Sequence, residues 1–345
     1  MRSSAFALAV LAVATAAHAQ VRTAEVPAVR ETTAVASARD AADDPAIWRN
    51  PADPSKSLIV ATDKQEGLYV YGLDGKTRSN LPAGRVNNVD LRAGVMIAGR
   101  RGVLVAASDR TDKANAKLAL FRLDTRTATL TALGDLPLGP GEAYGMCLWT
   151  RAKDHAVFAF VVRKDGTVVQ SKLDLSGPQP AAKEVRRVKL DTQSEGCAAD
   201  DRTGQLYVAE EDVGLWRIDA NPKSQAKPHA FARDDGKRLV ADAEGVAIAP
   251  RGKTGGVLVV SSQGDSAYAA YRLPDGKYLG RFRIVPGANS VDGTSDTDGI
   301  EIALGRFGPA FPDGLMVAQD GDNSPEAQNF KLVSWRAVRK ALKLP

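Results

Sequence analysis

Apolar and polar residues alternate along most of the chain in short runs, and Gly, Asp, Asn and Pro separate these runs. Residues 58–74 show the pattern: LIVATD, a polar turn, and then GLYVYG. A period of two, rich in β-branched and aromatic residues and bounded by turn residues, predicts pairs of β-strands. The same template recurs at 104–124, 157–175, 205–219, 257–276 and 314–335. Only the tail, 335–344, is predicted to be helical.

A second repeated segment precedes each of these strand pairs. Its copies combine an acidic or polar residue with apolar alternation, and equivalent positions lie 46 to 54 residues apart. The copies are DDPAIW at 43, NNVDLR at 87, YGMCLW at 144, SEGCAAD at 194, AEGVAI at 243 and TDGIEI at 297. Six units of about 50 residues with roughly four strands each are typical of β-propeller blades, which bury their faces only by stacking on neighbours.

The repeats predict an all-β fold, a six-bladed β-propeller that occupies residues 20–345 as a single domain. The strand-like stretch 21–37 precedes the first unit. We expect it to pair into the last blade, closing the ring and covering an exposed strand edge. A parallel β-solenoid is disfavoured because it needs a shorter repeat and ladders of identical residues.

The first residues have the pattern of a secretory signal peptide. Arg2 is followed by an apolar run over 5–17 and by Ala17-His18-Ala19, a small-residue cleavage pattern. We expect cleavage before Gln20, so that residues 1–19 are removed and the protein reaches the periplasm or the extracellular space. No later stretch is long and apolar enough to suggest a membrane anchor.

Composition narrows the possible partners. The net charge of +5 falls to +4 once Arg2 is removed, and no Lys/Arg block with interleaved aromatic residues occurs. Nucleic acid is therefore disfavoured as a partner, whereas a compact polyanion remains compatible with the charge. A monomer is expected.

Two cysteines and three histidines limit the metal chemistry. Cys147 and Cys197 do not make a disulfide scaffold in a chain of this size, and buried free thiols are favoured over a bridge. After loss of His18, only His155 and His229 remain, too few for a multi-histidine zinc site. Any metal must therefore be held by oxygen.

Equivalent turns of propeller blades converge around one mouth of the central channel, so their residues are considered together. Blades one to three contribute Lys64, Arg110 and Lys164. The remaining turns and the innermost strands contribute mainly acids: Asp43, Asp44, Asn87, Tyr144, Glu195, Glu211, Asp242, Glu244, Gln263, Asp265, Asp296, Asp298 and Asp320. Clustered carboxylates repel one another unless a hard metal cation neutralises them, which predicts bound calcium. The Lys and Arg side chains opposite the carboxylates are suited to bind phosphate oxygens.

Taken singly, each of these residues has an ordinary structural explanation. Asp, Asn and Gly are common turn residues, Lys64, Arg110 and Lys164 could be solvated surface groups, and Tyr144 could pack within a blade. Their joint placement in equivalent positions of a ring is what favours a site for a phosphate ester.

The motifs DDPAIW, NNVD, YGMCLW, SEGCAADD, LYVAEED, AEG, SSQGDS, DGTSDTDGI and VAQDG with QNFKLV resemble those of the β-propeller, or alkaline, phytase family. They run in order from residue 43 to residue 333. The resemblance implies six blades, several calcium ions, and phytate (myo-inositol hexakisphosphate) as the substrate of a phosphoric monoester hydrolase of the 3-phytase type.

The resemblance also implies roles for individual residues. Lys64, Arg110 and Lys164 would grip the phosphate to be cleaved, with Tyr144 contacting that site. Calcium ions that bind the phosphate and activate water would be held by Glu195, Glu211, Asp242 and Glu244, with Asp43 and Asn87 contributing nearby, and Asp44 is expected to be a metal ligand as well. Structural calcium would be held by the DGTSDTDG and QDGDN turns, which contain Asp292, Asp296, Asp298 and Asp320.

The resemblance also concerns three further residues, Gln263, Asp265 and Asp165. Gln263 and Asp265 would lie near a neighbouring phosphate pocket that anchors the substrate. Asp165, beside Lys164, stands where the family often has glutamate, and a carboxylate one methylene shorter reaches less far.

The sequence lacks an Arg-His-Gly histidine-phosphatase motif and a Cys-x5-Arg phosphatase loop. No residue is placed as an activated nucleophile, so direct attack of metal-activated water is expected. Two alternatives remain: a calcium-dependent lactonase or other hydrolase, and a propeller that binds calcium or a partner without catalysis.

Overall fold

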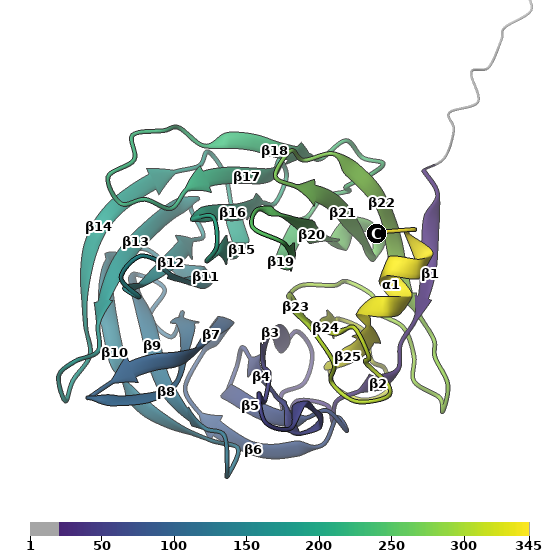
Figure 1. Cartoon of the computed structure of the whole chain (residues 1–345), viewed down its shortest axis with the longest axis horizontal. Helices are drawn as coiled ribbons and strands as arrows, with labels where there is room; N and C mark the ends of the chain where they lie inside the picture. Colours follow the sequence, from purple (N-terminus) through teal and green to yellow (C-terminus); the bar gives the residue numbers. More distant parts are fainter. Residues whose placement is uncertain (1–20, 345) are drawn as a thin grey trace, which may run out of the picture.

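Residues 21–344 are described by a computed structural model, and within them twenty-five strands form six sheets. The sheets stand radially around a central channel, as the blades of a β-propeller do (Figure 1). The chain ends in α1 (Trp335–Ala341), the helix predicted for the tail. The six-bladed all-β prediction is confirmed, while the expected signal peptide and cleavage site lie outside the described residues.

The first three blades each consist of four antiparallel strands that follow one another from the channel outward. Their strands are β3 (Ala42–Trp48), β4 (Leu58–Asp63), β5 (Gly67–Gly72) and β6 (Thr77–Pro82); β7 (Val86–Ile97), β8 (Arg100–Asp109), β9 (Asn115–Asp124) and β10 (Thr129–Pro140); and β11 (Ala143–Thr150), β12 (Val157–Arg163), β13 (Thr167–Asp174) and β14 (Ala181–Lys189).

Blades four and five repeat this order, and the sixth provides three strands of its own. Their strands are β15 (Ser194–Asp200), β16 (Gln205–Glu210), β17 (Gly214–Asp219) and β18 (His229–Arg233); β19 (Ala243–Arg251), β20 (Gly255–Ser262), β21 (Ala267–Leu273) and β22 (Tyr278–Val285); and β23 (Ile300–Leu304), β24 (Gly314–Asp320) and β25 (Asn329–Ser334).

The N-terminal stretch closes the ring, but it divides between two blades. β2 (Arg30–Glu31) pairs antiparallel with β25 and completes the sixth blade, as predicted. β1 (Thr23–Pro27) instead pairs parallel with β22 as a fifth strand of blade five, which the sequence prediction had not assigned. After Pro27, the Ala28 N–H still donates to the Val285 carbonyl of blade five, and the Val29 N–H donates to the Leu332 carbonyl of blade six, so the chain changes blades between these two residues.

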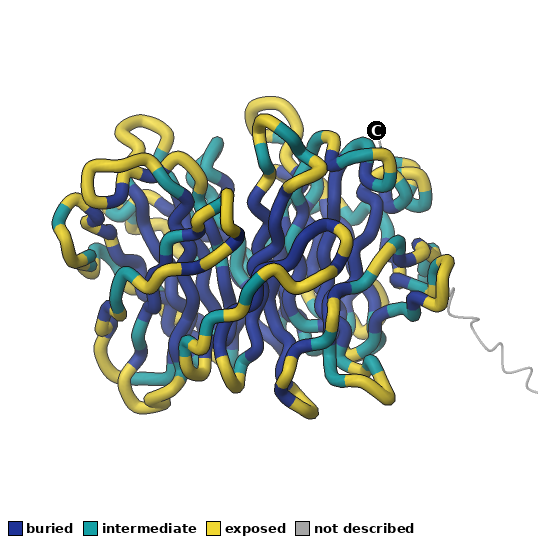
Figure 2. The backbone as a smooth tube through the Cα atoms, turned by 90° about the horizontal axis from the view of Figure 1, so that it is seen from below, coloured by how far each residue is buried: buried dark blue, intermediate teal, exposed yellow. Residues whose placement is uncertain are grey.

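Blade-to-blade packing supplies the hydrophobic core. Within residues 21–344, six clusters of buried apolar side chains occur, and each joins two neighbouring blades; one contains Val60 of the first blade and Val105 of the second. In side view the buried backbone fills the middle of the disc and the exposed loops lie on its rims (Figure 2). Each fully buried Val or Leu contributes about 1.5–3 kcal/mol, so the stacking of alternating strands explains the stability of the ring.

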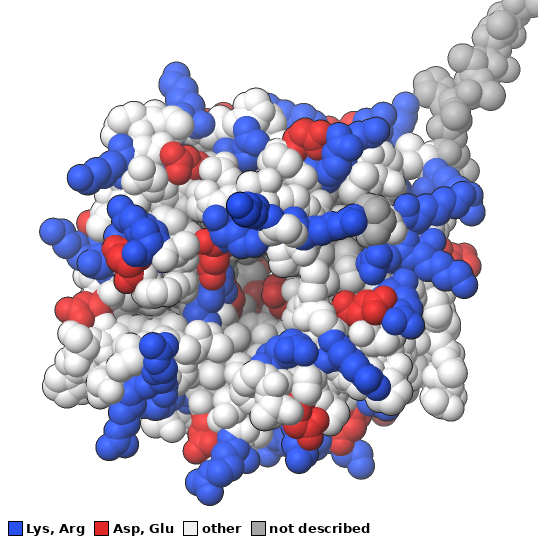
Figure 3. Space-filling view, viewed as in Figure 1, with Lys and Arg blue, Asp and Glu red and all other residues white. Residues whose placement is uncertain are grey.

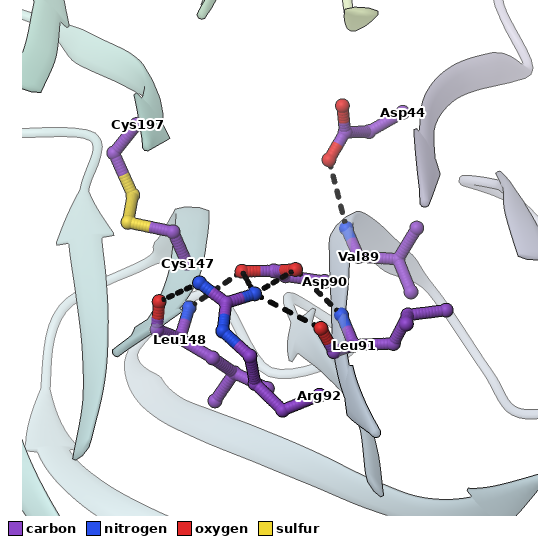
Figure 4. Close-up of a disulfide and its surroundings, with 8 residues drawn as sticks. All are labelled: Asp44, Val89, Asp90, Leu91, Arg92, Cys147, Leu148 and Cys197. Atoms are coloured by element: carbon purple, nitrogen blue, oxygen red, sulfur yellow. Dashed lines mark hydrogen bonds and ion pairs between the residues drawn. A yellow bond between two sulfur atoms is a disulfide. The ribbon is translucent and has the colours of Figure 1, made fainter. Parts of the chain in front are cut away.

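A disulfide joins the innermost strands of blades three and four. Cys147 on β11 and Cys197 on β15 are bonded, with their Cα atoms 5.7 Å apart (Figure 4). The preference for free buried thiols was therefore wrong. Sequence spacing could not reveal the pair, because the two cysteines are 50 residues apart and meet only when equivalent strands stack side by side.

Beside this disulfide, a partly buried arginine connects the inner sides of three blades. Arg92 pairs with Asp90 and donates to the Leu148 carbonyl, while Asp90 accepts from the Leu148 N–H (Figure 4). Arg92 Nε also lies 3.0 Å from Asp201 Oδ2, which is on the fourth blade's inner side. These contacts fix the relative positions of blades two, three and four around the channel.

None of the helices found in residues 21–344 has the length and apolar character needed to cross a lipid bilayer.

Replacing both Cys147 and Cys197 with serine should lower the free energy of unfolding by about 3–4 kcal/mol, because a cross-link that closes a loop of this length restricts the unfolded chain. Chemical denaturation under oxidising conditions measures the difference. In excess dithiothreitol the two proteins should unfold alike, and an equal stability of both under oxidising conditions would contradict the prediction.

Candidate functional site

Five of the innermost strands begin with a register irregularity, and candidate residues lie within it. In each of β3, β7, β11, β15 and β19, one or two residues near the start of the strand have no partner on the next strand. In that order, the unpaired residues lie between Ala42 and Pro45, between Val86 and Val89, between Ala143 and Gly145, between Ser194 and Cys197, and between Ala243 and Val246. The skipped positions hold Asp43, Asp44, Asn87, Tyr144, Glu195 and Glu244. Bulges of this kind turn side chains away from the regular alternation, here towards the channel.

A second set of candidates follows the second strand of each of blades one to five. The backbone N–H of each donates to a carbonyl in the loop that leads into its own blade's inner strand, with N···O distances of 2.7 to 3.2 Å. These residues are Lys64, Arg110, Lys164, Glu211 and Gln263. Identical bonds place their side chains at the same level, at one mouth of the channel. Figure 3 shows the opposite face, on which α1 lies; this face is also hollowed near its centre, with acidic and basic side chains in the hollow.

Three glutamates from blades four and five converge in this ring. One carboxylate oxygen each of Glu195, Glu211 and Glu244 lies within 4.8 Å of the others, and all three side chains are buried. Burial raises the pKa of Glu211 to about 7, and burial together with neighbouring carboxylates raises the pKa of Glu195 and of Glu244. Asp242 lies next to this group in sequence, and burial followed by Asp212 and Asp234 raises its pKa as well.

Lys64 lies among carboxylates instead of facing solvent. Its Nζ is 2.7 Å from Asp40 Oδ1, 3.1 Å from Asp43 Oδ2 and 3.2 Å from Asp298 Oδ2. Asp298 also accepts a hydrogen bond from Gln263 Nε2, so it lies between blades one and five. Burial raises the pKa of Asp298 to about 7, although Lys64 opposes the shift.

Arg110 is held from three sides. Its Nη1 donates to Asn87 Oδ1 at 2.7 Å, its Nη2 lies 2.7 Å from Glu142 Oε1, and its guanidinium carbon is 5.1 Å from the centre of the Tyr144 ring. Lys164 Nζ lies over the same ring at 5.0 Å. Two cations therefore share one aromatic ring, which attracts each through its π face.

Asn87 connects this cationic cluster to the carboxylates. Its amide nitrogen donates to Glu195 Oε1 at 2.6 Å while its oxygen accepts from Arg110. The structure therefore brings cations of blades one to three and acids of blades four to six together at one mouth of the channel, with Arg110 joined to Glu195 through Asn87 and Lys64 paired with Asp298.

Three buried polar atoms of this group have neither a hydrogen-bond nor an ion-pair partner among the described residues: Asp43 Oδ1, Glu211 Oε1 and Arg110 Nε. Orphaned carboxylate oxygens in an oxygen-only cluster fit a hard divalent cation such as calcium, and an orphaned guanidinium N–H fits an anion. The residues at the mouth therefore have the donor chemistry that a calcium ion requires.

Several candidates lie elsewhere. Asp44 Oδ2 accepts from the Val89 N–H at 3.0 Å and so joins β3 to β7 (Figure 4). Asp265 pairs with Arg281, whose side chain is almost fully buried. Asp165 caps a turn through the Thr167 N–H, with its side chain 64% exposed, and Asp296 is exposed.

The two remaining turn acids surround a lysine. Asp320 Oδ2 lies 3.0 Å from Lys331 Nζ, and Asp292 contacts the same ammonium group. With Glu31, three carboxylates surround this one ammonium group, and the structural calcium that the resemblance implied at these turns stays a prediction. Carboxylates raise the pKa of Lys331 even though burial opposes this, so the group stays charged.

Two acids that contact the site were not among the sequence candidates. Asp40 pairs with Lys64 and Glu142 with Arg110, and both stand in the loops that lead into an inner strand. Their position just before the repeated segments was the only available sign, since loop acids are common everywhere.

The comparisons with known proteins agree with this geometry. The family model described as Phytase matches residues 2–344. The chain belongs to the phytase family. It is 40% identical over 330 residues to a protein of Bacillus subtilis (strain 168) named 3-phytase, covering 92% of this chain and 85% of that protein. This phytase family member is accordingly a hydrolase of phosphatase type.

Asp265→Ala should lower the free energy of unfolding by about 2 kcal/mol, because it leaves Arg281 buried without its carboxylate. Asp165→Ala is the matched control, since the exposed Asp165 should change stability by less than about 0.5 kcal/mol. Thermal or urea unfolding measures both. Equal effects of the two substitutions would contradict the structural assignment of Asp265.

Proposed function

We propose that this protein is a calcium-dependent phytase of the 3-phytase type, which removes phosphate from myo-inositol hexakisphosphate by direct attack of water. The observation that carries the proposal is the meeting of Arg110, Lys164 and Tyr144 with the Glu195, Glu211 and Glu244 carboxylates at one channel mouth. Cations recognise the phosphate, and carboxylates hold the metal.

Phosphate recognition rests on the clamped guanidinium. Because Asn87 and Glu142 already hold Nη1 and Nη2, Arg110 is oriented before the substrate arrives, and its unpartnered Nε can donate to a phosphate oxygen. Lys164 adds a second positive charge over the same ring. Burial followed by the nearby glutamates raises the pKa of Tyr144, so its hydroxyl remains a donor at neutral pH.

Glu195, Glu211 and Glu244 would hold calcium, with Asp242 and Asp43 nearby. Bound calcium would supply positive charge against the phosphoryl oxygens and lower the pKa of water. The chain itself orients its carboxylates: Asn87 holds Glu195, and Lys64 holds Asp43 and Asp298. Fixed charges that need no reorganisation stabilise the charge that develops during phosphoryl transfer.

The lactonase alternative explains the acids but gives no role to the clamped cations, and the non-catalytic binding alternative is separated by the assay of phosphate release described below. The 3-phytase type rests on the Bacillus subtilis relative, which carries that name. Export through the N-terminal signal peptide is proposed on its residue pattern, since phytate would then be met outside the cytoplasm.

Purified protein should release inorganic phosphate from phytate in calcium, and excess EGTA should abolish the release by removing the ion that the three glutamates hold. A phosphate assay with and without chelator measures this. Re-addition of calcium should restore activity.

Three outcomes separate the alternatives. Full activity in EGTA would contradict the metal assignment, turnover of lactones without phosphate release would support the lactonase, and calcium binding without any turnover would support a binding propeller. A phosphorylated residue trapped during turnover would contradict direct attack by water.

Arg110→Ala should lower kcat/KM for phytate at least about 100-fold, since a charge-assisted phosphate contact is lost. Glu142→Gln should lower it about tenfold, because Arg110 loses a charged partner that orients it. Steady-state kinetics measure both, with thermal unfolding as a check on the fold.

Glu184→Gln is the matched control, because Glu184 also pairs with an arginine, Arg187, but on an exposed strand. It should leave kcat/KM unchanged. If Glu142 acts through Arg110, Glu142→Gln should have less than about a twofold further effect in the Arg110→Ala background. Additive effects would show that Glu142 acts independently.

A further inference from the structure

The hairpin formed by β7 and β8 extends beyond the inner strands of the other blades. β7 has 12 residues and β8 has 10, the longest first and second strands of any blade within residues 21–344. Because β7 begins at the active-site mouth, the turn of this hairpin lies at the opposite rim of the disc. Figure 3 shows this opposite face, on which Lys and Arg side chains predominate.

The end of this hairpin, residues 93–101, combines apolar and cationic side chains and is called the hairpin tip below. Its sequence, AGVMIAGRR, contains no acidic and no uncharged polar residue. Met96 is 50% exposed, and no other large apolar side chain of the described residues is exposed. Arg100 and Arg101 follow it and are exposed as well. An exposed methionine beside two arginines suggests a surface that a partner covers.

A groove of about 1030 Å³ lies between the hairpin tip and blade three. The Ala98 N–H donates to the Leu175 carbonyl at 2.8 Å, which holds the tip beside the turn between β13 and β14 (Figure 1). Val95 of the tip and Leu173 of blade three contribute to the apolar lining of the groove. Met96 lines it too, so the groove and the exposed methionine form one continuous surface.

Two lysines stand opposite each other on the blade-three side of the groove. Lys172 on β13 and Lys183 on β14 are direct partners in the strand register, and both are exposed and line the groove. Like charges at directly opposite positions destabilise a strand pair. Arg101 adds a third cation on the side of the hairpin tip. A bound anion would relieve the repulsion between the two lysines.

Two acids also line the groove, but the chain itself satisfies them. Arg151 Nη2 donates to Asp154 Oδ2 at 2.6 Å. Asp174 Oδ1 accepts from the Ser176 N–H at 3.0 Å and from the Ser176 hydroxyl at 2.6 Å. The groove therefore carries an excess of positive charge around its apolar lining.

We propose that the hairpin tip and the groove beside it dock this protein onto an anionic lipid bilayer. Arg100, Arg101, Lys172 and Lys183 contact the lipid phosphates, and Met96 enters the boundary between head groups and acyl chains. A bilayer surface presents phosphates above hydrocarbon, so it matches both the cations and the apolar lining, whereas a soluble anion matches the cations alone.

The docked orientation keeps the active site accessible. The hairpin tip lies on the face opposite the active-site mouth, so the mouth points away from the bilayer. The contact is peripheral and needs no membrane-spanning segment. This inference does not rest on the proposed catalytic activity, and its tests measure binding and stability only.

The first test measures binding to vesicles by sedimentation. Phosphatidylcholine vesicles with about 30 mol % phosphatidylglycerol should carry the protein into the pellet, and vesicles of phosphatidylcholine alone should not. Raising NaCl from about 0.1 M to about 0.5 M should release the protein, because salt screens the attraction between charges. An absence of binding to the anionic vesicles, or equal binding to both kinds, would overturn the proposal.

The second test locates the contact. Lys172→Gln combined with Lys183→Gln should weaken binding to the anionic vesicles at least about tenfold, since each lysine near such a surface adds to the attraction. Thermal unfolding should show no loss of stability, because the substitutions remove a pair of opposed like charges.

Lys223→Gln combined with Lys227→Gln is the matched control. These exposed lysines lie on the same face, in the loop between β17 and β18 of blade four, and their replacement changes the net charge equally. Binding should weaken less than about twofold. Equal losses in the two double variants would show that net charge alone attracts the protein, which would overturn docking at the groove. All variants share the N-terminal apolar run, so it cannot cause a difference between them.

The third test follows the methionine position directly. Cys147 and Cys197 are bonded to each other, so Met96→Cys offers a single thiol for the fluorescent label NBD. NBD emission should rise when anionic vesicles are added, because the label leaves water, whereas the label on Lys223→Cys should not respond. An unchanged emission of vesicle-bound Met96→Cys would overturn the proposal. An equal rise with soluble polyglutamate in place of vesicles would favour an acidic protein as the partner and would overturn it as well.

Discussion

Compensation of buried charge is the constraint on which this structure depends. The channel mouth brings charged side chains from neighbouring blades together, and burying such charges without a partner is costly. Lys64 is paired with three carboxylates and Arg110 is held by Asn87 and Glu142, so each cation is neutralised by groups from other parts of the chain. The contacts that compensate these charges therefore also hold the side chains of the site in place.

The same backbone geometry recurs in several blades, whereas the side chains that it places at the site differ from blade to blade. The same register irregularity opens five inner strands, and the same backbone hydrogen bond follows the second strand of five blades. Because the backbone is repeated, the side chain at each position can change without altering its placement. Lysine or arginine at the first three positions and glutamate at the fourth divide the mouth into a cationic and an anionic side.

The sequence predicted features that repeat and missed those that depend on single contacts. Blade number, strand pairs and the ring of turn residues followed from period-two alternation and a spacing of about 50 residues. The disulfide, the division of the N-terminal stretch between two blades and the pairing of Asp265 with Arg281 did not follow, since each depends on which side chains meet across neighbouring strands. Asp44 was placed in the right ring but bonds a neighbouring backbone N–H, because one position along a strand decides which way a side chain points.

The channel mouth is where this compensation of charge is incomplete. Among the described residues, Glu195, Glu211 and Glu244 converge without an ion pair, and Glu211 and Asp43 each keep a buried oxygen without a hydrogen-bond partner. Elsewhere the chain supplies its own cation to an acidic group, since Lys331 contacts Glu31, Asp292 and Asp320. A lysine among the three glutamates would occupy the space that water and a phosphate oxygen enter in the proposed reaction. An acidic group without a cation of its own is therefore what the proposed calcium-dependent reaction requires at this mouth.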